Sequence, residues 1–475
     1  MFQNGIDDYA AGPPHWSWVT DGTTFINPLG LVFTLLMGLL LLVLPRKYAL
    51  LPVIALLCYM TMGMRIMVGG LNFPMFRVLL LFGLAREILR REYRSIRLNS
   101  IDFAILWCTL ASIITFTLLW RSSGAFVNRL GQAYDSIGFY FLFRSVLRSM
   151  DDIHRVVKFL AILLVPVAGL VVVEKFTAQN FFSVFGGVPP VDFVRDGVVR
   201  CQGPFAHPIL AGTFGATLLP LFIGQWVGDK KSRFVPLLGI IASTTITISS
   251  GSSGPVLAYL AGGLGLGMWY LRKHMRTIRW GILLTIIGLH VVMKAPVWFL
   301  MARVDVFSGS SGWHRANLVD RCIANFGEWW LIGTRSTASW APEEQHLFDV
   351  TNQYISMATT GGLLLLVLFI MIIVRCFGGI GRAVRASEEG EQRAQSWQLW
   401  ALGAALFTHV VSFMSVSYFD QNIVNWYLLL AMISTGAGLF ISASARADAG
   451  AAQLEVVIPL AIEPAHDGAG AIRHA

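Results

Sequence analysis

An arginine and a histidine mark a short polar segment that leads directly into a long apolar run. Residues 199–208 read V-R-C-Q-G-P-F-A-H-P, so that Arg200 comes seven positions before His207. The Gly-Pro pair predicts a turn, and the second proline suits the first turn of a helix. An arginine at a helix N-terminus can bind an anion, whereas the alternative at a membrane surface is an anchor to lipid headgroups. His207 is a candidate proton carrier or substrate contact, with packing and a hydrogen bond to a carbonyl as the alternative.

A second polar cluster lies on a segment with helical periodicity, residues 313–330. Its apolar residues recur at spacings of four, four and three and predict one stripe along a helix: Leu318, Cys322, Phe326 and Trp329. Arg315 falls along this stripe, and a guanidinium on a buried face needs an anionic partner. That partner is either a carboxylate such as Asp349 or a substrate phosphate. His314 and Arg321 lie on another face of the same helix and are candidate substrate contacts.

A third cluster stands where the chain enters its next long apolar segment. Four polar residues share one helix face by their spacing of three, four and seven: Asp349, Asn352, Gln353 and Ser356. A polar face that enters a membrane helix indicates a water-filled cavity or a substrate. Asp349 is a candidate general base, and an N-cap is the alternative, because aspartate is favoured there. His346 is the nearest other ionisable group, and Asn352 and Tyr354 are candidate substrate contacts.

The composition limits what kind of protein can position these clusters. Of the 475 residues, 55% are hydrophobic and only 13% are charged, which excludes a disordered protein and a soluble enzyme. The net charge of +9 is explained by basic loops that hold a membrane topology, so nucleic-acid binding is not expected. The five cysteines form no CxxC pair or Cys/His cluster, and the sequence predicts neither a metal nor a cofactor.

Apolar segments recur along almost the whole chain. We predict an all-α polytopic membrane protein with about thirteen spanning helices, because each needs about 20 mostly apolar residues. The segments are 29–44, 49–64, 71–89, 101–120, 134–148, 156–173, 206–227, 234–249, 254–271, 279–293, 360–377, 397–418 and 422–442. The membrane domain is therefore placed at 29–442. Within it, Arg77 and Arg144 either pair with carboxylates or reach the membrane interface.

The distribution of lysine and arginine predicts the topology. Basic residues follow every odd-numbered apolar segment, so these loops are expected in the cytoplasm. Residues 1–28 hold three aspartates and no basic residue, and we expect them outside, not in a cleavable signal peptide. This topology places two long loops outside, at 174–205 and 294–350. An outer loop as long as the second is more often functional than a simple connector. The Ala- and Gly-rich tail, 443–475, is expected to be cytoplasmic and disordered.

In four features and in their order, the chain resembles the O-antigen ligase and polymerase superfamily of bacterial envelope glycosyltransferases. The features are R-C-Q-G-P-F-A-H-P with Arg200, the T-I-S-S-G-S-S-G-P turn between the eighth and ninth apolar segments, H-R-A-N-L with Arg315 and the later Gly333, and N-Q-Y-I followed by Gly361–Gly362. The resemblance covers residues 30–440. Each motif is loose by itself, and their combined order carries the specificity.

The resemblance implies a GT-C-type bundle of spanning helices with one large periplasmic loop. It implies a polyprenyl-diphosphate-linked glycan donor in the outer half of the membrane, a glycan or lipid-linked acceptor, and no metal. Two arginines of the family bind the diphosphate, and by position these would be Arg200 and Arg315. Arginine suits this role because its planar fork binds phosphate through two hydrogen bonds. Other polysaccharide-assembly proteins are further candidate partners, and the implied location is the bacterial inner membrane, with the N-terminus periplasmic and the C-terminus cytoplasmic.

The chain departs from the ligase pattern at two positions. In ligases of the superfamily a histidine precedes the asparagine of an H-N-x-Y/F-L motif and acts as the base, whereas here Thr351 precedes Asn352. Asp349 and His346 are the nearest ionisable groups, and the usual T-x-S-R-G turn has lost its arginine at 250–251. These departures favour a polymerase of O-antigen or exopolysaccharide repeat units over a ligase that transfers glycan to lipid A core. A non-catalytic assembly subunit and a transporter of lipid-linked glycans are the competing classes.

Overall fold

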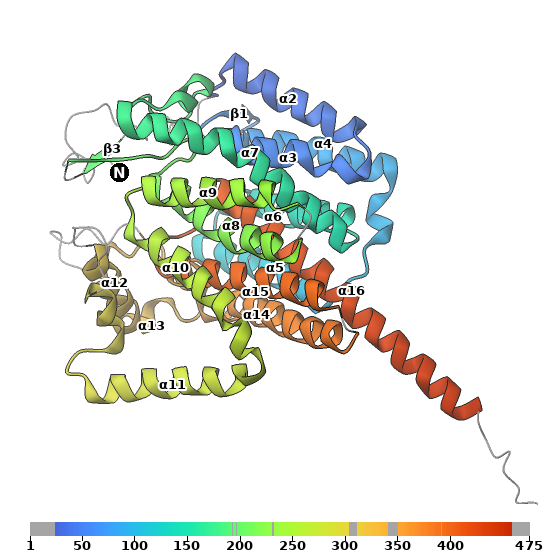
Figure 1. The fold of residues 1–475 in the computed structure, drawn as a ribbon. Coiled ribbons are helices and arrows are strands. Elements are labelled where there is room, and N and C mark those ends of the chain that lie inside the picture. The colour runs from blue at the N-terminus through green and yellow to red at the C-terminus, as the bar shows by residue number, and fades with distance from the viewer. Residues whose placement is uncertain are drawn as a thin grey trace, which may run out of the picture.

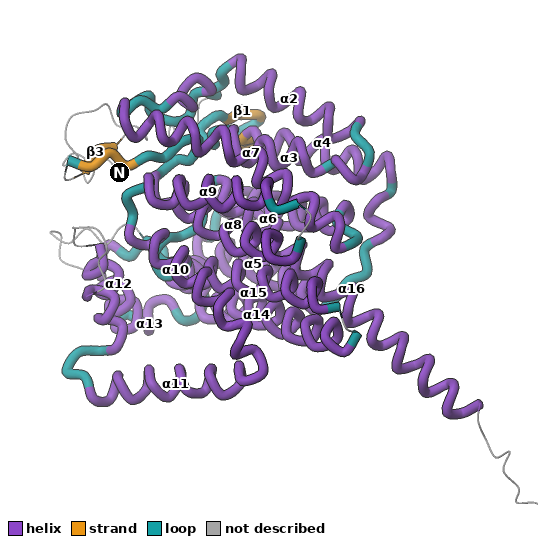
Figure 2. Tube along the Cα trace, in the orientation of Figure 1, coloured by secondary structure: helices purple, strands orange, loops and turns teal. Residues whose placement is uncertain are grey.

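The computed structural model describes residues 24–191, 193–195, 197–229, 232–303, 311–340, 350–390 and 392–457. These residues form a bundle of helices with two small β-hairpins at its surface (Figures 1 and 2). The helices are α2 (Pro28–Val43), α3 (Leu50–Tyr59), α4 (Met75–Arg90), α5 (Ser100–Trp120), α6 (Ser123–Val146), α7 (Met150–Thr177), α8 (Pro208–Gly228), α9 (Phe234–Ser249), α10 (Ser253–Gly267), α11 (Met275–Val292), α12 (Ser311–Ala324), α13 (Phe326–Trp329), α14 (Gln353–Glu389), α15 (Arg393–Ser412) and α16 (Gln421–Val457). Short 3-10 helices are η1 (Arg46–Tyr48), η2 (Glu92–Ser95), η3 (Phe181–Phe185), η4 (Met268–His274), η5 (Val297–Arg303) and η6 (Ala338–Trp340).

The two hairpins are antiparallel and two-stranded. In one, β1 (Arg65–Val68) pairs with β2 (Leu71–Pro74), and in the other β3 (Phe193–Arg195) pairs with β4 (Val198–Arg200). The first hairpin corrects two predicted boundaries. The apolar segments 49–64 and 71–89 were expected to be helical throughout, but α3 ends at Tyr59 and α4 begins at Met75. Two consecutive glycines between these segments favour a tight two-residue turn, and a hairpin forms around it.

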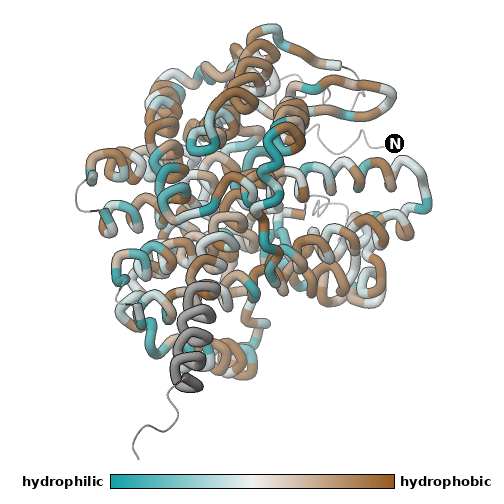
Figure 3. The backbone as a smooth tube through the Cα atoms, turned by 90° about the vertical axis from the view of Figure 1, so that its right-hand side faces the viewer, coloured by the Kyte–Doolittle hydropathy of each residue, from teal (hydrophilic) through white to brown (hydrophobic). Residues whose placement is uncertain are grey.

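Six segments of the described chain are long and apolar enough to cross a membrane. They are Ser100–Trp120, Met150–Thr177, Pro208–Gly228, Ser253–Val292, Gln353–Glu389 and Gln421–Ile441, while Pro28–Val43 and Phe234–Ser249 are apolar but shorter. Each of the thirteen predicted segments overlaps a helix, and hydrophobic stretches run along most of the backbone (Figure 3). The fold of the described chain is mostly helical, with six helices that could cross a membrane, as expected of an α-helical membrane protein, while the total of about thirteen spans stays a prediction.

Helix α8 lies in the interior of the bundle. It packs against α9, α10 and α15, and its aromatic side chains Phe214 and Phe222 are fully buried. Small residues, such as the glycines of α10, allow the close approach. A Cβ atom at Gly262 would lie 2.6 Å from Thr408 Oγ1 on α15 and 3.1 Å from Pro220 Cγ on α8. A larger residue at this position would force the three helices apart.

Both arginines that the sequence placed inside the membrane have carboxylate partners. Arg77 contacts Asp135 through Nε and Nη2 at 2.7–3.0 Å, and Arg144 Nε lies 3.2 Å from Asp102 Oδ1. Tyr140, one turn before Arg144 on the same helix, also donates to Asp102, so both side chains meet at this carboxylate. Asp102 is itself fully buried. A buried charge without such a partner would be strongly destabilising, so these pairs belong to the framework of the bundle.

Two helices leave the bundle. Helix α11 has no buried residue, and its main contacts are with η4 and η5 at its two ends (Figure 1). Helix α16 continues to Val457, so the described part of the expected disordered tail, 443–457, is helical. The β3–β4 hairpin, α12 and α13 lie at one end of the bundle, and α16 leaves it at the opposite end (Figure 1). We call the first the arginine end, because Arg200 and Arg315 lie there, and the second the far end.

Candidate functional site

The turn between α9 and α10 receives the side chain of Arg200 at the arginine end. Arg200 is the last residue of β4 and is half-buried. Its Nη2 donates to Ser252 Oγ at 2.5 Å, and its Nε donates to the carbonyl of Ser250 at 3.4 Å. Gly251, at the centre of this turn, has φ +57°, and a Cβ atom there would lie 3.1 Å from Arg200 Cγ. The turn therefore needs glycine both for its backbone and for the space that Arg200 occupies.

Arg315, on α12, reaches the first turn of α10, directly after this turn. A Cβ atom at Gly254 would lie 3.4 Å from Arg315 Nη2 and 2.6 Å from Ser415 Oγ. The segment 250–254 thus contacts Arg200 at the α9–α10 turn and lies close to Arg315 at the start of α10. Burial, and then the positive charges of Arg195 and Arg315, lower the pKa of Arg200 to about 10. The two guanidinium groups that the sequence singled out are therefore close enough to repel one another.

This arrangement concentrates positive charge beside two helix N-termini. Helix α10 begins at Ser253, directly after the turn that Arg200 contacts, and α8 begins at Pro208. Free backbone N–H groups and the helix dipole make such ends favourable for anions. Two arginines with planar, two-pronged donors add a preference for phosphate oxygens. The chemistry that this geometry suits is the binding of a diphosphate.

His207 has a structural role in the described chain. It is the N-cap of α8, and its Nδ1 accepts a hydrogen bond from the backbone N–H of Ile209 at 3.2 Å. Burial, and then the nearby charge of Arg200, lower its pKa to about 4. The imidazole is therefore neutral near pH 7, which favours the packing alternative over a proton carrier. A contact with substrate stays a prediction.

The apolar stripe of the second cluster forms, with one correction. Leu318, Cys322 and Trp329 are buried against the first turns of α14, where Ile355 and Ala358 complete a small core. The predicted stripe was wrong at one member, because the Phe326 side chain is 45% exposed. The reason is a break in the helix: α12 ends at Ala324, Asn325 leaves the helical conformation, and the short α13 restarts at Phe326 in a new direction. Arg315, His314 and Arg321 all lie on α12 and are half-buried.

At the third cluster, Asn352 and Tyr354 have contacts that stabilise the fold. Asn352 is the N-cap of α14, and its side chain accepts hydrogen bonds from the N–H groups of Tyr354 and Ile355. Tyr354 donates its hydroxyl to the carbonyl of Val410 at 3.1 Å. The cap that the sequence offered as an alternative role for Asp349 thus belongs to Asn352. Asp349 and His346, the two candidate bases, lie outside the described residues.

A kink in α14 holds the segment that follows α13. The helix departs from helical geometry at Gly361 and Gly362, and Gly362 has φ +73°. A Cβ atom at Gly362 would lie 2.5 Å from the carbonyl oxygen of Leu331, so glycine is required by both backbone and space. Two backbone hydrogen bonds of 2.8 Å fasten the segment on either side of the kink: Thr334 N to Thr359 O, and Leu363 N to Trp330 O. The Gly-Gly pair therefore positions α12 and Arg315 relative to α14.

The turn between α15 and α16 was missed by sequence reasoning. Gln353 donates its N–H to the carbonyl of Phe413 at 2.8 Å, and its Oε1 accepts from the N–H of Tyr418 at 2.6 Å. At the end of the same turn, Asp420 Oδ2 accepts from the N–H of Ala206 at 2.7 Å. The turn therefore joins the first cluster to the third. The only available signal was an aspartate directly before an apolar helix, which by itself indicates no more than a cap.

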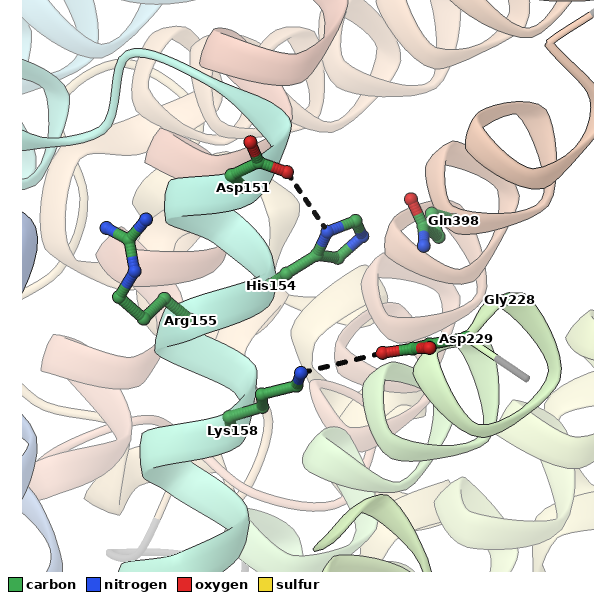
Figure 4. A pocket seen from close by; sticks show the side chains of 7 residues that line it. All are labelled: Asp151, His154, Arg155, Lys158, Gly228, Asp229 and Gln398. Atoms are coloured by element: carbon green, nitrogen blue, oxygen red, sulfur yellow. Dashed lines mark hydrogen bonds and ion pairs between the residues drawn. The ribbon is translucent and has the colours of Figure 1, made fainter. Parts of the chain in front are cut away.

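A polar pocket of about 400 Å³ lies at the far end, between α7, the C-terminal end of α8 and α15 (Figure 4). Lys158 extends toward Asp229, 3.5 Å away, and His154 lies 4.0 Å from Asp151. Arg155 points away from the pocket (Figure 4). Arg200 precedes the opposite end of α8, whose 21 residues correspond to roughly 30 Å of helix. The pocket is therefore separate from the two arginines.

The described residues contain no group of three or more histidine, cysteine, aspartate or glutamate side chains that could hold a metal ion. Within the described chain, no disulfide joins any of the five cysteines, which include Cys201 and Cys322 beside the two arginines. Comparison of the chain with models of protein families and with functionally curated proteins finds no match in either set. The functional interpretation therefore depends on the chain's own residues and on the resemblance of its motifs.

Proposed function

We propose that the chain is a metal-independent membrane glycosyltransferase that polymerises polyprenyl-diphosphate-linked oligosaccharide repeat units of O-antigen or exopolysaccharide. The observation that carries the proposal is the approach of Arg200 and Arg315, from segments more than a hundred residues apart, to one short glycine-containing segment, residues 250–254, where their charges repel. Two like charges brought together repel, and an anion bound between them would offset that repulsion. A diphosphate supplies two phosphate groups for two arginines.

In the proposed reaction, a hydroxyl oxygen of the acceptor glycan attacks the anomeric carbon of the donor. The bond between that carbon and the diphosphate oxygen breaks, and the diphosphate leaves with the electron pair. Arg200 and Arg315 stabilise the charge that develops on the leaving oxygen, which lowers the barrier electrostatically. A base, Asp349 or His346, takes the proton of the acceptor hydroxyl. The diphosphate activates the donor, so the reaction needs no nucleotide.

The arrangement of charge also supports the proposed topology. Arg46, paired with Asp152, and Arg272, paired with Glu388, belong to loops that the sequence assigns to the cytoplasm. The arginine end would then face the periplasm, with the donor lipid in the outer leaflet of the inner membrane. The N-terminal segment would lie on the same side as Arg200, and the end of α16 on the cytoplasmic side.

A ligase that transfers glycan to lipid A core is the alternative, and one observation bears on the choice. Thr351, not histidine, precedes the N-cap Asn352 of α14. A threonine hydroxyl is a poor base at neutral pH, so the ligase mechanism would have to take its base from elsewhere. The polymerase is therefore the stronger proposal.

The test is incubation of the purified protein, in liposomes, with a lipid-linked repeat unit and no added acceptor. A polymerase gives a ladder of products on a gel. A single shifted band that appears only when lipid A core is added would replace the polymerase by the ligase. No product in either case, with the protein correctly inserted, would overturn transfer and favour an assembly subunit or a transporter.

A further inference from the structure

The turn between α15 and α16 carries a buried carboxyl group that the proposed mechanism does not use. We propose that Asp420 is a positioning residue, which holds the segment behind Arg200 in place and couples it to the mouth of α14. The contacts of Asp420 stand by themselves, whereas the catalytic consequence rests on the proposed function.

One carboxyl group serves the beginnings of two helices. Asp420 is 5% exposed, and its Oδ2 accepts the N–H of Ala206 at 2.7 Å, one residue before the N-cap of α8. The N–H of Gln421, the first residue of α16, also donates to it. The positive ends of α8 and α16 both favour an acceptor that can carry negative charge. Asp420 therefore fixes the start of α8 against the start of α16.

Three other buried side chains hold the same stretch of chain. Gln421 Nε2 donates to the carbonyl of Pro204 at 3.0 Å, and Asn180 Nδ2 donates to the carbonyl of Gly203 at 2.8 Å. From α7, Glu174 Oε1 accepts the N–H groups of Gln202 at 2.6 Å and Gly203 at 3.0 Å. With the hydrogen bond to Asp420, five hydrogen bonds hold the segment 202–206, which begins two residues after Arg200. A shift of this segment would carry Arg200 away from the segment 250–254 that it shares with Arg315.

The opposite side of the Asp420 turn is fastened to α14. Besides the two hydrogen bonds of Gln353, the N-cap Asn352 donates its Nδ2 to the carbonyl of Met414 at 3.5 Å, and Ser417 donates its hydroxyl to the carbonyl of Val350. Residues 350–353 directly follow the segment that holds the candidate bases. The turn from 413 to 420 therefore links the leaving-group side of the proposed site to its acceptor side.

The conformation of Asp420 is unfavourable for stability, which argues for a further role. Its backbone has φ +62°, a left-handed conformation that non-glycine residues seldom adopt. Its Oδ1 is buried without a hydrogen-bond partner in the described part of the chain. Aspartate tolerates this backbone better than most residues. Glycine would adopt it with less strain, and asparagine would adopt it without burying a charge. The position is thus explained by what the carboxyl group holds.

The protonation of Asp420 changes near neutral pH. Burial raises its pKa to about 7, against the opposing effect of the two backbone N–H groups. The titratable groups on the elements around it are His207 at the start of α8, Glu174 on α7, and Tyr418 on its own turn. None of the ion pairs in the described residues involves Asp420. The ionised carboxylate accepts the stronger hydrogen bond from Ala206, whereas burial of its charge costs stability, so the hold on residues 202–206 should change as the pH passes 7.

Cys201 provides a readout that needs no enzyme activity. Its side chain is 1% exposed and lies directly after Arg200. Asp420→Ala should raise the rate at which N-ethylmaleimide labels Cys201, identified by mass spectrometry, by at least about tenfold, because the segment opens more often. Asp420→Asn keeps a hydrogen-bond acceptor but cannot ionise. The ratio between the Cys201 labelling rates of this variant and of the wild type should therefore change between pH 6 and pH 8.

The matched control is Asn425→Ala on α16, the helix that begins directly after Asp420. Asn425 Nδ2 donates to Thr217 Oγ1 at 3.0 Å, which ties α16 to α8 one turn further along without touching residues 202–206. This variant should lower thermal stability and leave Cys201 labelling within about twofold of the wild type. Equal labelling of Cys201 in wild type and Asp420→Ala would overturn the positioning role. If Asp420→Ala does not fold, a pH-independent ratio between wild type and Asp420→Asn overturns it instead.

The catalytic consequence has a separate readout. With a lipid-linked donor, wild-type turnover should show an inflection near pH 7 that Asp420→Asn lacks, and KM for the donor should change more than kcat. If labelling responds as expected and no variant, the wild type included, shows turnover, the positioning role stands and the proposed function fails. If turnover is present with the same pH profile in wild type and Asp420→Asn, the coupling of Asp420 to the site is refuted.

Discussion

Gly251→Ala is a small change that should disturb the site without dismantling the fold. The new methyl group would lie 3.1 Å from Arg200 Cγ, whereas carbon atoms in good contact are about 3.5–4.0 Å apart. Arg200 would therefore move by a few tenths of an ångström. A misplacement of about 1 Å at a reacting centre costs roughly 100-fold in rate, so we expect a loss of about tenfold here.

The backbone strain of this substitution needs its own control. Gly251 has φ +57°, and alanine in a left-handed conformation costs about 1–2 kcal/mol. Gly69, in the β1–β2 hairpin, has φ +58° and no atom within 4 Å of the position of a new Cβ. Gly69→Ala should therefore lose the same stability and keep its activity.

The assay for both variants is turnover of a lipid-linked donor by protein in liposomes, alongside thermal unfolding in detergent. We expect similar losses of unfolding temperature and a tenfold difference in turnover. Activity of Gly251→Ala within twofold of the wild type would refute the contact between this turn and a catalytic Arg200. An equal loss of activity in Gly69→Ala would show that general strain, and not the displacement of Arg200, is responsible.

Three further predictions concern the framework. Arg144→Leu leaves Asp102 buried without its ion-pair partner and should lower the unfolding free energy by about 3–5 kcal/mol, measured by denaturation in detergent. A loss below about 1 kcal/mol would mean that water replaces the guanidinium group. The folded-state pKa of Asp420 is raised from 3.8 to about 7, so its contribution to stability is complete below pH 4 and declines as pH rises to 7. The unfolding temperature of the wild type should accordingly fall from pH 5 to pH 7 relative to Asp420→Asn, and parallel curves would contradict this pKa. Reporter fusions at residues 10 and 460 should give opposite signals, and equal signals would indicate an even number of spans.

Local sequence patterns predicted the helices but left two roles open for Arg77 and Arg144, a carboxylate partner or the membrane interface. The structure decides for the carboxylates, and the partner of Arg144, Asp102, comes from a different helix. Boundaries were less predictable where turn chemistry competed with hydrophobicity, as at the β1–β2 hairpin. The stripe failed at Phe326, directly after the helix break at Asn325, and periodicity alone does not indicate a break.

The candidate site was predictable in part. The residue type and position of Arg200 and Arg315 indicated anion binding, and both lie at the segment 250–254, as expected of a shared ligand. Asn352 and Tyr354 were selected for their polar groups, but those groups satisfy α14 and the carbonyl of Val410. The role of Asp420 could not be predicted from the sequence, because it depends on a hydrogen bond with Ala206, 214 residues away along the chain. Contacts of that kind follow from the packing of helices and leave no local pattern.

The central claim is that two arginines bind the diphosphate of a lipid-linked donor. Its most direct test is the turnover of Arg200→Lys and Arg315→Lys, with expression and insertion checked for each. Lysine keeps the charge but loses the two-pronged contact, so each variant should raise the barrier by about 2–4 kcal/mol, or roughly 30- to 1000-fold in rate. Arg321→Lys, on the same helix as Arg315, should stay within a few fold of the wild type. Near-normal turnover in both Arg200→Lys and Arg315→Lys would contradict the diphosphate site.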